Sequence, residues 1–161
     1  MMRLKTRALR IFPRAVMALV SILTCGKLAA AHDVALVTSK NSQVKVMLAA
    51  DLTRIIKNMH KWPDGHDLIV VLTDTSSLEM RIVAQKLLSL TPEEFKKSID
   101  ATNKKRMTFW VVSSDDEVLK IVQSNTSAIG LVNVYSINSS VEVVKIDGKL
   151  PLEPGYVLHS Q

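Results

Sequence analysis

The sequence predicts an α/β fold: a single three-layer domain with a mixed sheet of about five strands and helices packed on it. Short apolar runs typical of buried strands alternate along the chain with segments of helical periodicity. Several of the helical segments begin with recognisable capping residues. The chain has no repeat, no low-complexity segment and no linker that would divide it. Alternating strands and helices favour one sheet covered by helices.

Two strands and one helix are predicted in the first half of this domain. Residues 34–37 and 68–72 are short apolar runs that read as buried strands. Residues 46–58 have helical spacing, with Asn58 as a left-handed C-cap. One side of that helix is apolar, with Leu48, Leu52, Ile55 and Ile56. Trp62-Pro63-Asp64-Gly65 predicts a turn in which Trp62 buries apolar area, because proline fixes φ and glycine accepts a positive φ.

Two further helices are predicted from their first residues. Ser76 with Glu79 has the spacing of a capping box ahead of a helix over residues 78–90. The next helix has Thr91 as its N-cap and Pro92 at its first position, where the missing N–H of proline costs nothing.

The last part of the chain predicts a helix between strands. Residues 108–112, 128–132 and 141–146 are expected strands, and an extended tail follows the last of them. Ser114 with Glu117 predicts a capping box at the start of the intervening helix. The apolar face of that helix has Val118, Leu119, Ile121 and Val122.

Residues 1–31 have the pattern of a cleaved export signal, which leaves residues 32–161 as the domain. A basic start precedes the apolar run 15–24, which is shorter than the ~20 residues of a membrane-spanning helix, and Ala29–Ala31 supply small residues for cleavage. Lys27 leaves an uncleaved anchor as an alternative, and Cys25 a lipid attachment. The expected location is the periplasm.

The charge balance argues against a nucleic-acid partner. The chain has 21 Lys+Arg and 15 Asp+Glu, but six of the bases and none of the acids lie in residues 1–31. Residues 32–161 therefore have 15 of each and a formal net charge of zero, which removes the field that a phosphate backbone requires. The run Lys104–Arg106 is interpreted as a solvated helix end. No cysteine remains in the domain, so no disulfide is expected.

Four stretches resemble, in order, the sequence of phosphate-type periplasmic solute-binding proteins. Ser114–Val132 resembles that family's late capped helix, polar turn and Ala-Ile-Gly strand. Residues 51–65 resemble its Leu-x-x-Ile-Phe helix and Trp-x-x-Gly turn. Residues 76–93 resemble its Ser-x-x-Arg helix, with Arg81 on the family arginine, and residues 143–156 resemble its closing strand and tail.

The resemblance implies one lobe of a periplasmic binding protein. Members of the family are two-lobed, about twice as long, and close around an oxyanion. It therefore implies phosphate or a related small oxyanion as ligand and a membrane transporter of the ABC type, or another envelope protein, as partner. The sequence departs from the family pattern where aromatic residues are common, at Ile56, Ala84 and Leu131.

The expected oxyanion site is the start of the helix at residue 78. Free N–H groups and the positive end of a helix dipole suit phosphate or sulfate, and hydroxyls and a guanidinium add donors. The ordinary alternative is a helix cap and a surface arginine, which the nearby carboxylates of Asp74 and Glu79 favour. A second polar cluster follows the first strand. The candidate ligands are Thr75, Ser76, Ser77, Arg81 and Ser42.

Other chemistries receive less support from the residues. His60 and His66 flank a turn and could hold a metal, but a plain surface turn explains them better, so no metal or cofactor is expected. No Ser-His-Asp pattern, glycine-rich phosphate loop or Cys/His cluster is present, so no enzyme is expected. The alternative function is a periplasmic protein-interaction module that retains the fold and has lost the ligand.

Overall fold

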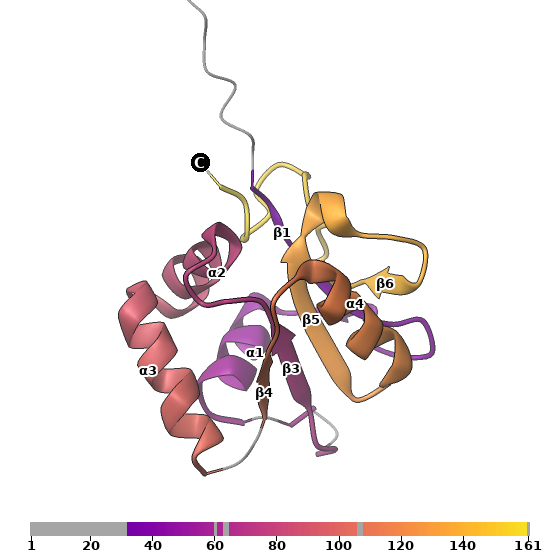
Figure 1. The fold of residues 1–161 in the computed structure, drawn as a ribbon. Helices are drawn as coiled ribbons and strands as arrows, with labels where there is room; N and C mark the ends of the chain where they lie inside the picture. The colour runs from indigo at the N-terminus through magenta and orange to yellow at the C-terminus, as the bar shows by residue number, and fades with distance from the viewer. Residues whose placement is uncertain (1–31, 60, 63–64, 106–107, 161) are drawn as a thin grey trace, which may run out of the picture.

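The structure of the chain is a computed structural model that describes residues 32–160, apart from 60, 63–64 and 106–107 (Figure 1). The predicted export signal lies outside the described residues. The domain has a five-stranded mixed sheet, as the sequence predicts, and a separate two-stranded sheet. No helix among the described residues is long and apolar enough to cross a membrane.

The five-stranded sheet is mixed because its first strand runs against the central ones. Its order is β4-β3-β5-β1-β6. β3 is parallel to both β4 and β5, whereas β1 is antiparallel to both β5 and β6. The bounds are β1 Val34–Ser39, β3 Ile69–Leu72, β4 Phe109–Val111, β5 Ala128–Asn133 and β6 Val141–Val143.

Two predicted elements differ from the structure at the two-stranded sheet. β2 (Val46–Met47) pairs in parallel with β7 (Lys145–Ile146), so the helix predicted from residue 46 begins only at Ala49. The strand predicted over 141–146 divides at Val144, with β6 in one sheet and β7 in the other. Backbone hydrogen bonds from Lys145 N to Lys45 O (2.9 Å) and from Asp147 N to Met47 O (3.0 Å) hold this pairing. Leu48, predicted on the apolar helix face, is 55% exposed.

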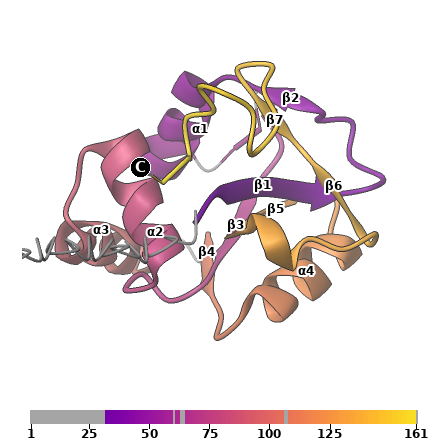
Figure 2. The same ribbon diagram turned by 90° about the horizontal axis from the view of Figure 1, so that it is seen from above.

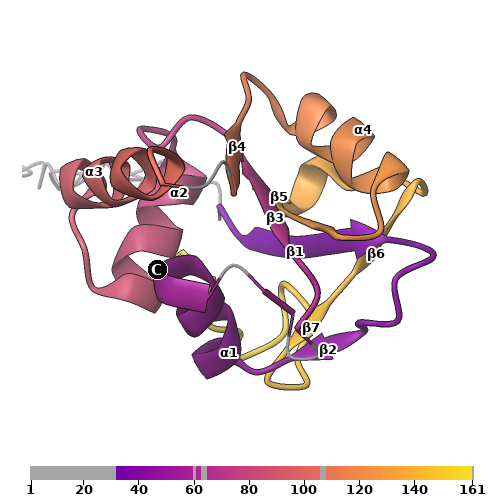
Figure 3. The same ribbon diagram turned by 90° about the horizontal axis from the view of Figure 1, so that it is seen from below.

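Helices cover both faces of the larger sheet (Figures 2 and 3). One apolar cluster lies between the sheet and α4, and a larger one lies on the other face, where it includes residues of α1, α2 and α3. This is the predicted three-layer arrangement. The bounds are α1 Ala49–Arg54 continued by a π-helical segment Ile55–Met59, α2 Leu78–Val83 continued by a π-helical segment Ala84–Leu88, α3 Pro92–Asn103, α4 Asp115–Ser124 and a 3-10 turn Val134–Ser136.

The helix caps follow the sequence at α3 and in part at α4. Thr91 and Glu94 form a capping box with Pro92 at the first position. The Ser114 hydroxyl accepts from Glu117 N (3.4 Å), but the Glu117 carboxylate accepts from Ser113 N (2.9 Å) and not from Ser114 N. Asn58, predicted as a C-cap, lies within the π-helical segment that follows α1.

The tail packs into the core instead of extending away from it. Tyr156 and Leu158 are 4% and 0% exposed. Val34 N donates to Leu158 O (3.0 Å), and the Tyr156 hydroxyl donates to Val34 O (3.0 Å). Burial raises the pKa of Tyr156. The tail therefore fixes the start of β1, and with it the position of residues 32 and 33.

Candidate functional site

The topology brings several polar segments to one edge of the sheet. Strands β3, β4 and β5 are parallel and end level with one another, because Leu72 pairs with both Val111 and Leu131. We call this the carboxyl edge, and the opposite edge, where the same strands begin, the amino edge. β1 starts at the carboxyl edge, since Val34 pairs with Asn133. Open α/β sheets commonly bind ligands where parallel strands end.

The turn between β3 and α2 places three hydroxyl residues at the carboxyl edge. Ser77 is the N-cap of α2, and its hydroxyl accepts from Met80 N (3.2 Å) and lies 3.3 Å from the Thr73 hydroxyl. Ser76 is exposed, and Thr75 is buried with 6% exposure. The predicted cap at Ser76 is therefore wrong by one residue.

Asp74 explains the displaced cap. Its carboxylate accepts from Ser76 N (2.9 Å), and its backbone carbonyl accepts from Ser77 N (2.9 Å). Aspartate side chains commonly form such turns with the backbone two residues on. The hydrogen bonds from the Ser76 backbone and side chain lower the pKa of Asp74, so this carboxylate is ionised at neutral pH.

Glu79 faces β5 and the start of the domain rather than the turn before it. Its carboxylate accepts from Asn133 Nδ2 (2.8 Å) and lies 3.4 Å from His32 Nδ1. Burial raises the pKa of Glu79, but the hydrogen bonds from Asn133, from its own backbone and from His32 outweigh that effect and lower it overall. The capping box predicted for Ser76 and Glu79 is therefore absent, because Glu79 is committed to Asn133.

Asn133 joins two helix starts to the end of β5. While its side chain donates to Glu79, its backbone N–H donates to Asp115 Oδ2 (3.1 Å). The beginnings of α2 and α4 consequently flank the end of β5. The surroundings of the hydroxyl turn are therefore rich in carboxylates.

Arg81 lies apart from the hydroxyl turn. It is exposed and lines a hollow of about 570 Å³ at the junction with α3, together with Gln85, Ser89, Leu90, Thr91 and Pro92. The hydroxyls of Ser76 and Ser77 do not line that hollow. Sequence spacing placed Arg81 one turn into the helix, but spacing along the chain does not set the direction of a long side chain.

Ser42 lies at the amino edge, away from Thr75, Ser76 and Ser77. β1 is antiparallel to β5, so its end near Thr38 is level with Ile129, at the beginning of β5. Ser42 is 8% exposed, and its hydroxyl accepts from Val44 N (3.2 Å). The expectation that Ser42 follows a strand at the ligand-binding edge is corrected by the direction of β1.

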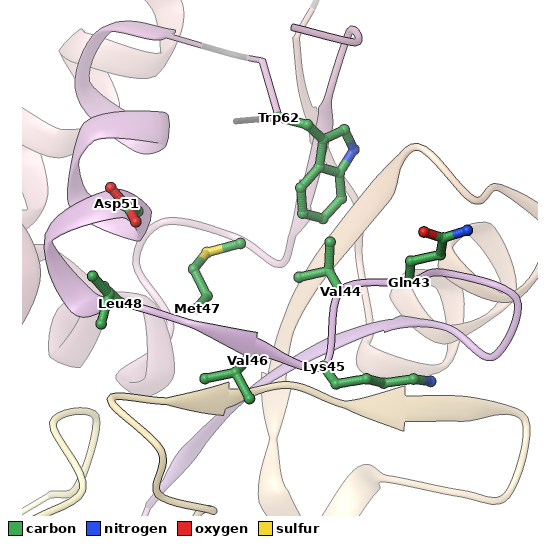
Figure 4. Close-up of a pocket in the computed structure, with 8 residues that line it drawn as sticks. All are labelled: Gln43, Val44, Lys45, Val46, Met47, Leu48, Asp51 and Trp62. Carbon is green, nitrogen blue, oxygen red and sulfur yellow. The ribbon is translucent and has the colours of Figure 1, made fainter. Parts of the chain in front are cut away.

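Two adjoining hollows flank Trp62 near the amino edge. One, of about 490 Å³, lies between Trp62 and the segment that includes β2, and Figure 4 shows its lining side chains. The other, of about 430 Å³, adds Ser42, His66 and two polar residues before β5. Trp62 is 7% exposed and belongs to the larger apolar cluster, as the sequence predicts. His60 lies outside the described residues, within which no group of three potential metal ligands occurs.

A buried polar cluster that the sequence patterns did not predict joins the two ends of the domain. Asp33 is fully buried, and its Oδ1 lies 2.6 Å from His159 Nδ1 and accepts from Ser160 N (3.3 Å). His32 N donates to the Ser160 hydroxyl (2.7 Å). The only hint was the apolar pair Tyr156 and Leu158, which indicates that the tail is buried.

Comparison with solved structures identifies the fold. No family model and no curated protein matches the sequence. A phosphate ABC transporter substrate-binding protein from Clostridium perfringens, crystallised with bound phosphate, superposes with a TM-score of 0.60 at 21% identity, over 73% of this chain and 46% of its own. A phosphate transport receptor from Vibrio cholerae gives 0.62 at 18% over 80% and 54%. PstS from Borrelia burgdorferi gives 0.65 at 16% over 81% and 55%.

These neighbours are binding proteins, and this chain spans about half of their length. At these identities the likeness concerns the fold alone. Five strands in a mixed sheet between helix layers, matched over half of each neighbour, give this chain the fold of one lobe of a phosphate ABC transporter substrate-binding protein.

Proposed function

We propose that this chain is an exported, non-enzymatic solute-binding-like protein that binds phosphate or a related oxyanion at the carboxyl edge. The observation that carries the proposal is the turn from β3 into α2, where Thr75, Ser76 and Ser77 lie at the end of the central strands. Hydroxyls and main-chain N–H groups at such a position suit an oxyanion. The bound phosphate of the Clostridium perfringens neighbour supports the same ligand class.

The carboxylate of Asp74 gives the proposed site a preference for phosphate over sulfate. Asp74 lies within the turn and has a lowered pKa, so it acts as a hydrogen-bond acceptor at neutral pH. Phosphate retains at least one proton at that pH and can donate it in a hydrogen bond to Asp74. Sulfate has no such proton and meets only charge repulsion from the carboxylate.

Calorimetric titration with phosphate and with sulfate tests the proposal. Phosphate is expected to bind and sulfate to bind at least about tenfold more weakly, the loss of one charge-assisted hydrogen bond. Ser76→Ala should weaken phosphate binding, because Ser76 is exposed in the turn. Arg81→Ala is the matched comparison, and its place in a separate hollow predicts a smaller effect than Ser76→Ala. Binding of neither anion would remove the support for this function, and equal binding of both would contradict the selectivity assigned to Asp74.

Export and delivery to a membrane transporter are part of the same proposal. Residues 1–31, with six bases, a short apolar run and Ala29–Ala31, support secretion to the periplasm and cleavage near His32. Mass spectrometry of the periplasmic fraction should find a form that starts at or near His32. Recovery of the full-length chain alone, in the membrane fraction, would contradict cleavage.

A protein-interaction module that has lost its ligand is the second candidate function. The specific observation in its favour is that Asp74 and Ser77 already satisfy donors and acceptors within the turn, while Glu79 adds a second carboxylate nearby. Two ionised carboxylates oppose an anion. Absence of phosphate binding in the calorimetric titration, with the fold intact, is the result that favours this candidate.

A further inference from the structure

The charges of the domain are divided between the two edges of the larger sheet. Acidic residues stand at the carboxyl edge, in the turn after β3 and at the starts of α2 and α4: Asp74, Glu79, Asp115, Asp116 and Glu117. Lysines stand at the amino edge, after β1, before β3 and before β4: Lys40, Lys57, Lys61, Lys104 and Lys105. The formal neutrality of residues 32–161 therefore does not mean that charge is spread evenly over these two edges.

Opposite charges at each edge only partly offset this division. At the amino edge, Glu142 is paired with Lys45 (3.5 Å), and Asp67 forms a backbone bridge with Lys61. At the carboxyl edge, the His32 ring lies 3.4 Å from the Glu79 carboxylate. The five lysines of the amino edge are exposed to solvent. At the carboxyl edge, Asp74, Asp116 and Glu117 are exposed.

Large apolar side chains stand exposed among the acids of the carboxyl edge. Leu78 is 46%, Val111 48% and Tyr135 72% exposed. They lie at the same edge of the sheet, because Leu78 opens α2, Val111 ends β4 and Tyr135 follows β5. We call these three side chains and the five acids the acidic patch.

The amino edge offers a receiving surface of opposite charge. The hollow of about 430 Å³ lies beside Trp62 and Val44 and ends at Thr126 and Ser127, and Lys40 and Lys61 are next in the chain to its lining residues Asn41 and Trp62. Figure 4 shows Gln43, Val44 and Trp62, which this hollow shares with its neighbour. An aromatic side chain such as that of Tyr135 suits a cavity with one aromatic wall and polar groups at its rim. We call the hollow and the five lysines the basic patch.

We propose that copies of this chain associate head to tail, with the acidic patch of one copy on the basic patch of the next. Contact between two acidic patches would bring carboxylates against carboxylates, whereas the head-to-tail contact places them opposite lysines. The two patches are different surfaces of one chain, so the contact is heterologous and can be repeated by a third copy. The acidic patch shares Asp74 with the proposed oxyanion turn, but the association depends on the charges and apolar side chains of the two edges and does not rest on anion binding.

Sedimentation of the untagged protein recovered from the cell tests the proposal. The average mass should rise with protein concentration without stopping at the dimer, because the contact leaves a free patch at each end. It should fall when salt is raised from about 0.1 M to about 1 M, since the screening length shrinks from about 10 Å to about 3 Å. A monomer at every concentration, a closed dimer, or association that is indifferent to salt would overturn the proposal.

Two patch-blocking variants make the test specific. Asp116→Lys with Tyr135→Ser blocks the acidic patch, and Lys40→Glu with Lys105→Glu blocks the basic patch; all four side chains are exposed. Each variant alone should associate at least about fivefold more weakly, in line with the loss of one or two surface charge pairs. Lys86→Glu, which reverses one charge on the π-helical segment after α2 and outside both patches, is the control and should associate like the parent.

A mixture of the two blocked variants distinguishes head-to-tail association from association through a symmetric interface. Each variant retains the patch that the other has lost, so an equimolar mixture should form a one-to-one dimer that cannot grow further. Failure of the mixture to associate, with both variants folded by circular dichroism, would overturn the proposal. The mixing is done in phosphate-free buffer, because Asp74 belongs both to the acidic patch and to the proposed oxyanion turn; failure of phosphate to bind in the titration would then leave the mixing result unchanged.

Discussion

His159 Nδ1 lies 2.6 Å from Oδ1 of the fully buried Asp33, which joins the tail of the chain to the residue before β1. Asp33 Oδ2 is buried without a hydrogen-bond partner among the described residues, so His159 and Ser160 supply the polar contacts that the carboxylate has. An unpaired buried carboxylate is costly, and the imidazole therefore stabilises the closed tail.

Removal of His159 should destabilise the fold through Asp33. His159→Ala is expected to lower the free energy of unfolding by about 1–3 kcal/mol, the cost of leaving a buried polar group without its partner. The double variant with Asp33→Asn should lose less than the sum of the two single losses, because both act on one contact. Urea unfolding of the four proteins measures this, and strictly additive losses would show that the two side chains do not stabilise each other.

Glu79 should make stability depend on acid pH. Its pKa is lowered from the ordinary value of 4.5 by Asn133 and His32 against the effect of burial, so the unfolded chain binds its proton more readily than the folded one. The stabilisation is complete above about pH 4.5 and is lost as the pH falls through the lower folded-state value.

Glu79→Gln isolates that contribution. The difference in unfolding free energy between parent and variant should be largest near neutral pH and should shrink below about pH 4.5. Glu94→Gln is a useful comparison, since the lowered pKa of Glu94 comes from the cap at Thr91 and not from His32 or Asn133. A difference for Glu79→Gln that stays constant from neutral to acid pH would contradict the assigned contacts.

Gly130 sets the distance between α4 and β5. A Cβ atom at this position would lie 2.6 Å from Val118 Cγ1 and 2.9 Å from Val122 Cγ2. Gly130→Ala should therefore cost about 1–3 kcal/mol of stability through overpacking. The same change beside Val118→Ala should cost less than the sum of the two single changes, because the shortened side chain makes room. Thermal unfolding of the three variants checks this coupling.

Asn103 covers the exposed edge of β4. Its side-chain amide donates to Phe109 O (2.9 Å) and its carbonyl accepts from Phe109 N (3.0 Å), as a neighbouring strand would. Asn103→Ala should lower stability by about 1–3 kcal/mol and increase aggregation, because an uncovered edge invites strand pairing. Asn103→Asp keeps only the acceptor and should be intermediate. Light scattering after mild heating measures the aggregation, and equal scattering by all three proteins would exclude this role.

The sequence predicted those elements that depend on local chemistry. The central strands are apolar runs, and Thr91 with Pro92 starts α3 as expected. β2 and β7 could not be predicted, because each has two residues and exists only through a partner about a hundred residues away. The N-cap is Ser77 and not Ser76, because the Asp74 carboxylate accepts from the backbone N–H of Ser76. This contact is local in the chain, but the role predicted for Asp74 was only that of a charge opposed to an anion.

The candidate site was predicted less well than the fold, for a topological reason. Whether Ser42 meets Thr75 depends on the direction of β1, which apolar runs do not encode. The position of Arg81 depends on side-chain direction, and the contact of Glu79 with Asn133 depends on a residue more than fifty positions away. The turn itself was correctly placed at the start of a helix.

The most direct test of the oxyanion site is an NMR titration of the nitrogen-labelled protein with phosphate. The backbone amides of Thr75, Ser76 and Ser77 should shift progressively and saturate at or below about 10 mM phosphate, the range of a binding energy of a few kcal/mol. The amide of Ser42, at the opposite edge of the sheet, should remain unchanged. Unmoved turn amides at that concentration, or shifts confined to the lysines of the amino edge, would contradict an oxyanion site at the carboxyl edge.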